Sequence, residues 1–135
     1  MTPFRVLVVE DDATIAKFMQ QTLHETGAVE TEYVHFASCA AEANAFLGQF
    51  PYHVVSLDGS FPETENGPMD RGAGLKLIQR LRDVNCRCIF FSGNDRQVES
   101  AATMQVGTHP VIARLKSKYP LEKWAELIAS FKEKS

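Results

Sequence analysis

The chain has 135 residues, a net charge of -3 and 44% hydrophobic residues, values typical of one globular domain with its own core. Its 14 basic residues are outnumbered by 17 acidic ones, which argues against a general nucleic-acid binder. No apolar run approaches the roughly 20 residues of a membrane span, and the N-terminus lacks the long apolar segment of a signal peptide. We therefore expect one cytoplasmic domain over residues 1–135, with protein partners and no direct contact with nucleic acid or membrane.

The predicted elements alternate between strands and helices along the whole chain. The N-terminal half predicts, in chain order, a strand at 5–9, a helix with apolar residues at 15–23, a strand at 31–36, a helix at 40–49 and a strand at 52–57. The C-terminal half predicts a helix at 75–81, a strand at 88–91, a weaker helix at 98–106, a strand at 111–115 and an amphipathic helix at 121–131. Five such units specify right-handed crossovers and a parallel sheet with helices on both faces.

Polar residues follow the strands at the edge where open parallel sheets bind their ligands. These residues are Glu10, Asp11, Asp12, Asp58, Ser92 and Lys116. Each has a structural alternative when it is taken alone. Asp12 before a helix is a good N-cap, Asp58 suits a turn, and a lone lysine is most often solvated.

The combination of these residues predicts a metal and phosphoryl site. Glu10, Asp11 and Asp58 are expected to lie close together, where carboxylates repel one another unless a cation binds. Mg²⁺ is the cation that best fits one or two carboxylates with waters and a phosphate. Asp58 is then a candidate nucleophile, because carboxylates form aspartyl phosphates. Lys116 and Ser92 can neutralise the remaining phosphoryl oxygens, which is most of what this transfer requires.

The chain resembles the receiver domain of two-component response regulators, the CheY-like superfamily. The segments that carry the resemblance are VLVVEDD, HVVSLDGSFP, GLKLIQRLR, FFSGN and the lysine after the fifth strand. The resemblance implies a flavodoxin-like (βα)5 three-layer sandwich with strand order 2-1-3-4-5. It also implies that a histidine kinase or a phosphotransfer protein supplies the phosphate, and that a downstream protein is bound in response.

The resemblance assigns roles to individual residues. The residues at the metal positions of the family are Glu10, Asp11, Asp58 and, through its carbonyl, Ser60. Asp11 is the direct ligand of the acidic pair, and Glu10 acts through water. Asp58 is the phosphoacceptor, Ser92 takes the place of the switch serine or threonine, and Lys116 that of the phosphate-pairing lysine.

Three departures from the family pattern affect the expectations. Residues 63–73 form an insertion beside the site, expected to be a surface loop or a cover over the acceptor. The lysine lacks the usual following proline, so Lys118 is an alternative to Lys116. Residues 113–115 lack the usual aromatic side chain. We therefore expect the signal to leave the site through residues 93–95 and the helix that follows them, rather than through the fifth strand.

Two other functions remain open at this point. A degenerate receiver would bind a partner without phosphate, although all the functional positions are filled. A Mg²⁺-dependent phosphohydrolase would also use an aspartyl phosphate, but Asp58-Gly59-Ser60 lacks the second acid of the haloacid-dehalogenase type. We therefore expect a phosphoacceptor rather than an enzyme with a separate substrate, whether the chain is complete or an excised receiver.

Overall fold

A five-stranded parallel sheet forms the centre of the protein, whose computed structural model describes residues 2–135. The strand order is β2-β1-β3-β6-β9. The bounds are β1 Val6–Val9, β2 Val34–Ala37, β3 Val54–Asp58, β6 Arg87–Ser92 and β9 Ile112–Leu115. Counted as parallel strands along the chain, this order is 2-1-3-4-5, so the predicted fold class is confirmed.

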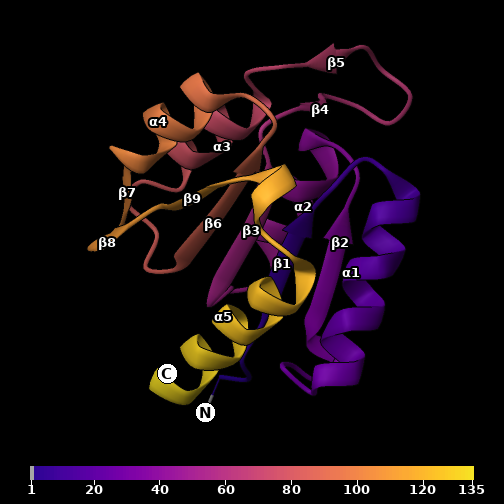
Figure 1. Cartoon of the computed structure of the whole chain (residues 1–135), viewed down its shortest axis with the longest axis vertical. Coiled ribbons are helices and arrows are strands. Elements are labelled where there is room, and N and C mark those ends of the chain that lie inside the picture. The colour runs from indigo at the N-terminus through magenta and orange to yellow at the C-terminus, as the bar shows by residue number, and fades with distance from the viewer. Residues whose placement is uncertain (1) are drawn as a thin grey trace.

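Helices cover both faces of the sheet (Figure 1). The helices are α1 Ala13–Thr26, α2 Ala40–Gln49, α3 Ala73–Arg80, α4 Asp95–Ala102 and α5 Leu121–Lys134. The first and last pack on one face, and the three middle helices pack on the other. Among the described residues, no helix has both the length and the apolar character needed to cross a membrane.

The core has two layers because successive strand residues point to opposite faces of the sheet. Leu7, Val55 and Phe90 face α2, α3 and α4, whereas Val8 and Ile89 face α1 and α5. Since helices bury both faces, the strands read as continuous apolar runs rather than alternating ones. The residues that follow the strands are therefore positioned by a sheet that is packed on both faces.

One indole is hydrogen-bonded inside the α1/α5 layer. Trp124 is fully buried, and its Nε1 donates to the hydroxyl of Ser56 at 2.8 Å. A buried indole N–H without a partner would cost free energy, so this bond satisfies both polar groups. It ties α5 to β3, the strand that carries Asp58 at its end.

Two predicted elements differ from those observed. The strand expected at 31–36 begins with a 3₁₀ turn, Thr31–Tyr33, and pairs with β1 only from Val34 onward, because β1 itself starts at Val6. The helix expected to reach Val106 ends at Ala102. Val106 lies instead in β7 Gln105–Val106, which pairs with β8 His109–Pro110. Its side chain is still buried in the core, which explains the apolar signal.

The insertion at residues 63–73 contains part of a short β-hairpin rather than an irregular loop. β4 Phe61–Pro62 pairs antiparallel with β5 Met69–Asp70. The buried ring of Phe61 anchors the hairpin in the core, and Lys76 of α3 binds the Asp70 carboxylate at 2.7 Å. The hairpin projects at the top of Figure 1, at the end of the molecule where the parallel strands finish.

Candidate functional site

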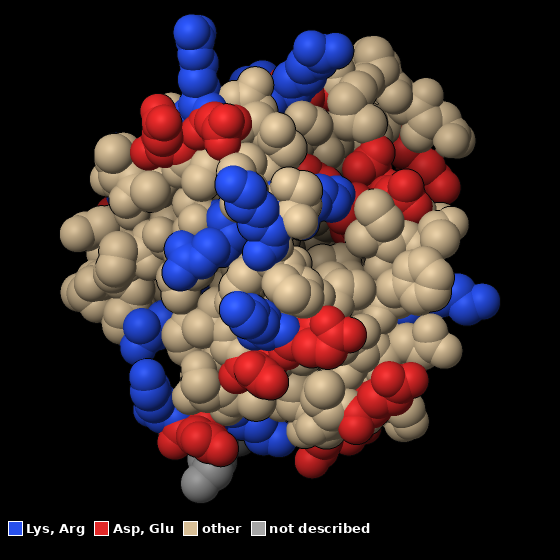
Figure 2. Space-filling view, in the orientation of Figure 1, with Lys and Arg blue, Asp and Glu red and all other residues tan. Residues whose placement is uncertain are grey.

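Three carboxylates meet at the C-terminal ends of β1 and β3. Each of Glu10, Asp11 and Asp58 offers a carboxylate oxygen, and the three atoms lie within 4.8 Å of one another. The sheet register causes this, since Val9 lies opposite Leu57 and the acids follow immediately on both strands. Figure 2 shows acidic side chains gathered where β1 ends and α1 begins in Figure 1.

The third acid of the VLVVEDD segment has a different position. The Asp12 side chain accepts hydrogen bonds from the backbone N–H groups of Thr14 and Ile15, at 2.9 and 3.1 Å. This is helix N-capping, which satisfies two donors that have no partner within the helix. The structural alternative therefore holds for Asp12, while its two predecessors point into the acidic cluster.

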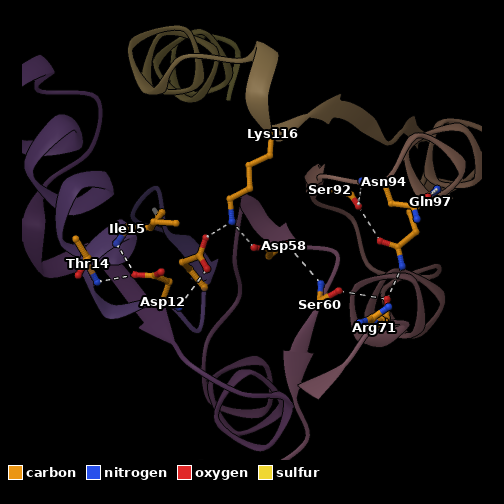
Figure 3. Close-up of polar contacts among 11 residues, drawn as sticks. Asp12, Thr14, Ile15, Asp58, Ser60, Arg71, Ser92, Asn94, Gln97 and Lys116 are labelled. Atoms are coloured by element: carbon orange, nitrogen blue, oxygen red, sulfur yellow. Dashed lines mark hydrogen bonds and ion pairs between the residues drawn. The ribbon is translucent and has the colours of Figure 1, made fainter. Parts of the chain in front are cut away.

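Lys116 connects the acidic side chains of β1 and β3. Its Nζ lies 2.5 Å from Asp58 Oδ2 and 3.1 Å from Glu10 Oε1 (Figure 3). The lysine begins the 3₁₀ turn η2 Lys116–Lys118 directly after β9, and its side chain is 36% exposed. Lys118 is exposed at the end of the same turn. The geometry therefore favours Lys116 over its alternative.

The electrostatics of the cluster leave a deficit of positive charge. Burial and the charge of Asp58 raise the pKa of Glu10 from 4.5 to about 7, although Lys116 acts in the opposite direction. For Lys116, burial works against the charge, but the hydrogen bonds and ion pairs with both carboxylates outweigh it and raise the pKa. One ammonium does not balance three carboxylates, so a further cation would be stabilised here.

The other side of the site is built from neutral groups. Ser92, at the end of β6, is 3% exposed, and its hydroxyl donates to Oε1 of Gln97 on α4 at 2.7 Å. The N–H of Asn94 donates to the same hydroxyl at 3.0 Å. An open cleft of about 410 Å³ joins this serine to Asp11 and Asp58. Predicted residues at the ends of three strands, β1, β3 and β6, thus line one space.

A close backbone approach places α3 against the end of β3, beside Asp58. The N–H of Gly74 donates to the carbonyl of Gly59 at 3.0 Å. A Cβ at position 74 would collide with the backbone carbonyl of Asp58 and the ring of Phe90. Glycine is therefore required at this position for the N-terminus of α3 to lie beside the residue that ends β3.

The chain matches a family described as the response regulator receiver domain over residues 6–117. The chain belongs to this family. No curated protein sequence matches it. Receiver domains are signalling domains that work with histidine kinases or phosphotransfer proteins, and the acidic cluster fits their Mg²⁺ and aspartyl-phosphate site.

Solved receiver structures share the fold at low sequence identity. The Francisella response regulator 1452 receiver domain is 20% identical, with a TM-score of 0.72 over 99% of this chain and 100% of that one. A CheY-like receiver domain protein from Methanospirillum hungatei JF-1 is 23% identical, with a TM-score of 0.66 over 99% and 100%. A Clostridium difficile response regulator is 15% identical, with a TM-score of 0.71 over 96% of each chain.

The receiver has no aromatic ring in β9 near the lysine. Ala113 is buried, and Arg114 is exposed with its guanidinium 5.8 Å from the centroid of the Tyr119 ring. Tyr119 lies after the strand and packs on Phe91, with ring centroids 5.6 Å apart. As the sequence indicated, β9 therefore places no aromatic ring beside the site.

Gln97 was not predicted from the sequence, and the carbonyl of Arg71 was covered only by the general expectation that residues 63–73 lie beside the site. Gln97 bonds to Ser92, and Arg71 offers its backbone carbonyl to the Gln97 side chain. A glutamine among the polar residues that begin a helix belongs to no motif that would mark it as a site residue. Its position three residues after the N-cap Asn94 places it on the first turn of α4, which is the only hint that it faces the strand end.

Proposed function

We propose that this receiver is a phosphorylation switch in which Asp58 accepts a phosphoryl group. The observation that carries the proposal is the bridge from Lys116 to Asp58 and Glu10, at 2.5 and 3.1 Å. A carboxylate nucleophile with a cation beside it suits phosphoryl transfer, in which catalysis is mostly positioning and charge neutralisation. The donor is the phosphorylated histidine of a kinase or a phosphotransfer protein.

In the proposed transfer, a carboxylate oxygen of Asp58 forms a bond to phosphorus while the P–N bond of the phosphohistidine breaks. The imidazole nitrogen keeps the electron pair of the broken bond, and Asp58 becomes an acyl phosphate. Lys116 and the Ser92 hydroxyl then each bind a phosphoryl oxygen. Attack by water at phosphorus later releases inorganic phosphate and restores the carboxylate. The domain thus assists its own phosphorylation and dephosphorylation without a separate substrate.

The donor set of the acidic cluster suits Mg²⁺, because the ion prefers hard oxygen ligands and usually binds few carboxylates. The residues that would hold it are Asp11, Asp58 and the carbonyl of Ser60, with Glu10 acting through water. When bound, the ion supplies positive charge beside the phosphoryl group. The chain itself orients these ligands through the ends of β1 and β3, where the sheet leaves little freedom.

The proposal includes a cytoplasmic location and a downstream protein partner. It does not include direct contact with nucleic acid. Lys and Arg side chains are interspersed with Asp and Glu on the face drawn in Figure 2, whereas a nucleic-acid binder usually gathers them on one face. The phosphoryl charge would act on the cleft surface around Ser92 and Asn94, so we expect the partner to read that region.

Incubation with acetyl phosphate and Mg²⁺, followed by mass spectrometry, tests the proposal. We expect one phosphoryl adduct per chain, located on Asp58. The adduct should not form when the metal is chelated before acetyl phosphate is added. Release of many equivalents of phosphate per chain from varied phosphate esters would point to a phosphohydrolase instead. If neither acetyl phosphate nor a phosphorylated phosphotransfer protein produces an adduct, the proposal is wrong. The domain then binds its partner without phosphate.

A further inference from the structure

The hydroxyl of Ser92 is already committed in the unphosphorylated structure. It donates to Oε1 of Gln97 at 2.7 Å and accepts from the N–H of Asn94 at 3.0 Å. A serine hydroxyl has a single proton to donate. To bind a phosphoryl oxygen on Asp58, it must therefore release Gln97.

The carboxamide of Gln97 is bonded at both of its ends. Its Nε2 donates to the backbone carbonyl of Arg71, which also accepts from the hydroxyl of Ser60 at 3.5 Å (Figure 3). A carbonyl can only accept, so the amide nitrogen must face Arg71 and the amide oxygen must face Ser92. One side chain thus joins the end of β6 to the residue that follows β5.

The position of Gln97 depends on the residue after the acceptor. A Cβ on Gly59 would lie 2.5 Å from Gln97 Oε1, closer than real Cβ atoms approach such a neighbour. Gly59 therefore leaves the space that the carboxamide occupies. Gln97 lies against the backbone next to Asp58, although it belongs to α4.

We propose that Gln97 is a positioning residue that links the state of Ser92 to the β4–β5 hairpin. In the free receiver it holds the serine hydroxyl away from Asp58 and holds Arg71 at the cleft wall. When the hydroxyl turns to a phosphoryl oxygen, Gln97 loses its donor, the carboxamide moves, and the bond to Arg71 is lost. The hairpin, which carries the 52% exposed Met69, changes position with the site. This inference rests on the proposed function.

Apart from its pairing with β4, β5 has few contacts that would oppose this movement. Asp70 accepts from the N–H of Gly72 at 2.9 Å and pairs with Lys76, whose side chain is 70% exposed. Exposed ion pairs contribute little, because water screens them. By contrast, Phe61 on β4 is fully buried. β5, which Arg71 follows, is therefore the strand of the hairpin that we expect to move.

The decisive experiment compares amide chemical shifts with and without Mg²⁺ and beryllofluoride, which stands in for the phosphoryl group. In the wild-type receiver we expect shifts at residues 92–97 and also at 61–71. Gln97→Met keeps the length of the side chain but neither hydrogen bond. We expect its shifts at 61–71 to fall at least twofold while those at Ser92 persist. Its beryllofluoride affinity should rise about fivefold, because the hydrogen bond from Ser92 to Gln97 no longer competes with the bond from Ser92 to beryllofluoride.

Two further variants separate the two bonds. Gln97→Glu can still accept from Ser92 but cannot donate to Arg71, so we expect weakened hairpin shifts without a gain in affinity. Arg96→Ala alters an exposed neighbour on α4 and should match the wild type in both measurements. Gly59→Ala displaces the unmodified carboxamide, and its hairpin shifts should fall as they do in Gln97→Met.

The outcomes distinguish this inference from the function on which it rests. If the wild type responds to beryllofluoride and Gln97→Met retains full shifts at 61–71, the link through Gln97 is wrong while the phosphorylation switch stands. If the wild type shows hairpin shifts no larger than those of the distant helix α5, the link is also wrong. If the wild type shows no response near Asp58, both the switch and the link are wrong.

Discussion

The two sides of the cleft beside Asp58 are held by different forces. On the side of β1 and β3, an ammonium lies between carboxylates, and the contacts are charged and half-buried. On the side of β6 and α4, a hydroxyl, a carboxamide and a backbone carbonyl form a neutral chain of hydrogen bonds. Ser92 and Asp58 face each other across the space between these two sides.

We infer from this difference that the two sides of the cleft have different roles. Phosphoryl transfer depends on fixed charges that neutralise the phosphoryl oxygens, so the charged side suits a permanent chemical site. Exchanging one neutral hydrogen bond for another changes the free energy by only about 1 kcal/mol, so the neutral side suits a reversible response. The predictions below test the charged side first and the neutral side last.

The largest effect is expected for Asp58→Asn. The amide lacks the nucleophilic carboxylate, so labelling by acetyl phosphate should be abolished. Mass spectrometry of the intact chain measures the adduct. Asp12→Asn is the matched control, because asparagine also caps helices and position 12 lies outside the cluster. Full labelling of the Asp58 variant, with the control normal, would place the acceptor elsewhere.

Replacement of Lys116 should have the next largest effect. Lys116→Met removes the ammonium at 2.5 Å from Asp58, and we expect labelling to slow at least tenfold, in line with the loss of one charge-stabilising donor. Lys118→Met removes a charge from an exposed position of the same turn and should change the rate less than twofold. Equal effects of the two variants would show that Lys116 acts only through general charge.

Asp11→Asn tests the metal. The variant removes one of three carboxylates within 4.8 Å, so we expect the Mg²⁺ dissociation constant to rise about tenfold or more. Amide shifts of residues 10–12 and 58–60 during a Mg²⁺ titration measure it. Asp12→Asn again serves as the control. An unchanged dissociation constant in Asp11→Asn would contradict the proposed ligand set.

Glu10→Gln should stabilise the metal-free receiver at high pH. The pKa of Glu10 is raised from 4.5 to about 7 in the folded state, so the folded chain binds more protons than the unfolded chain between these values. In the wild type, the contribution of Glu10 to the free energy of unfolding therefore falls as pH rises from about 4.5 to 7. Glutamine removes the penalty, on the order of 1–3 kcal/mol at pH 8. Urea unfolding at pH 8 and pH 4.5 should show this gain only at the higher pH.

The smallest expected effect concerns β9. Without a large ring at residues 113–115, beryllofluoride should perturb amide shifts at 92–104 at least twice as much as those at 111–115. Ala113 is small and buried, and Arg114 is exposed beside Tyr119, so neither offers a large ring that could turn inward. Equal perturbation of the two segments would mean that another group, such as the Tyr119 ring on Phe91, carries the signal.

The sequence alone was sufficient for the sheet and for the charged side of the site. Strands buried on both faces leave long apolar runs, and the parallel arrangement brings the residues that follow them to one edge. Glu10, Asp11 and Asp58 could therefore be placed together from the sequence alone, with either Lys116 or Lys118 beside them. The same reasoning identified Asp12 as a possible cap, which the hydrogen bonds to α1 confirm.

Tertiary structure alone decided the neutral side of the site. Gln97 and the carbonyl of Arg71 meet across 26 residues, and neither a side-chain amide nor a backbone group leaves a periodic signal. The secondary structure of residues 61–70 and of Val106 depended on antiparallel pairing with partners a few residues away. Such short strands have a free energy similar to that of a loop or a helix end, so the sequence does not choose between them. Apolar periodicity determines which residues are buried, whereas the pairing of neutral polar groups depends on distances that only the folded chain defines.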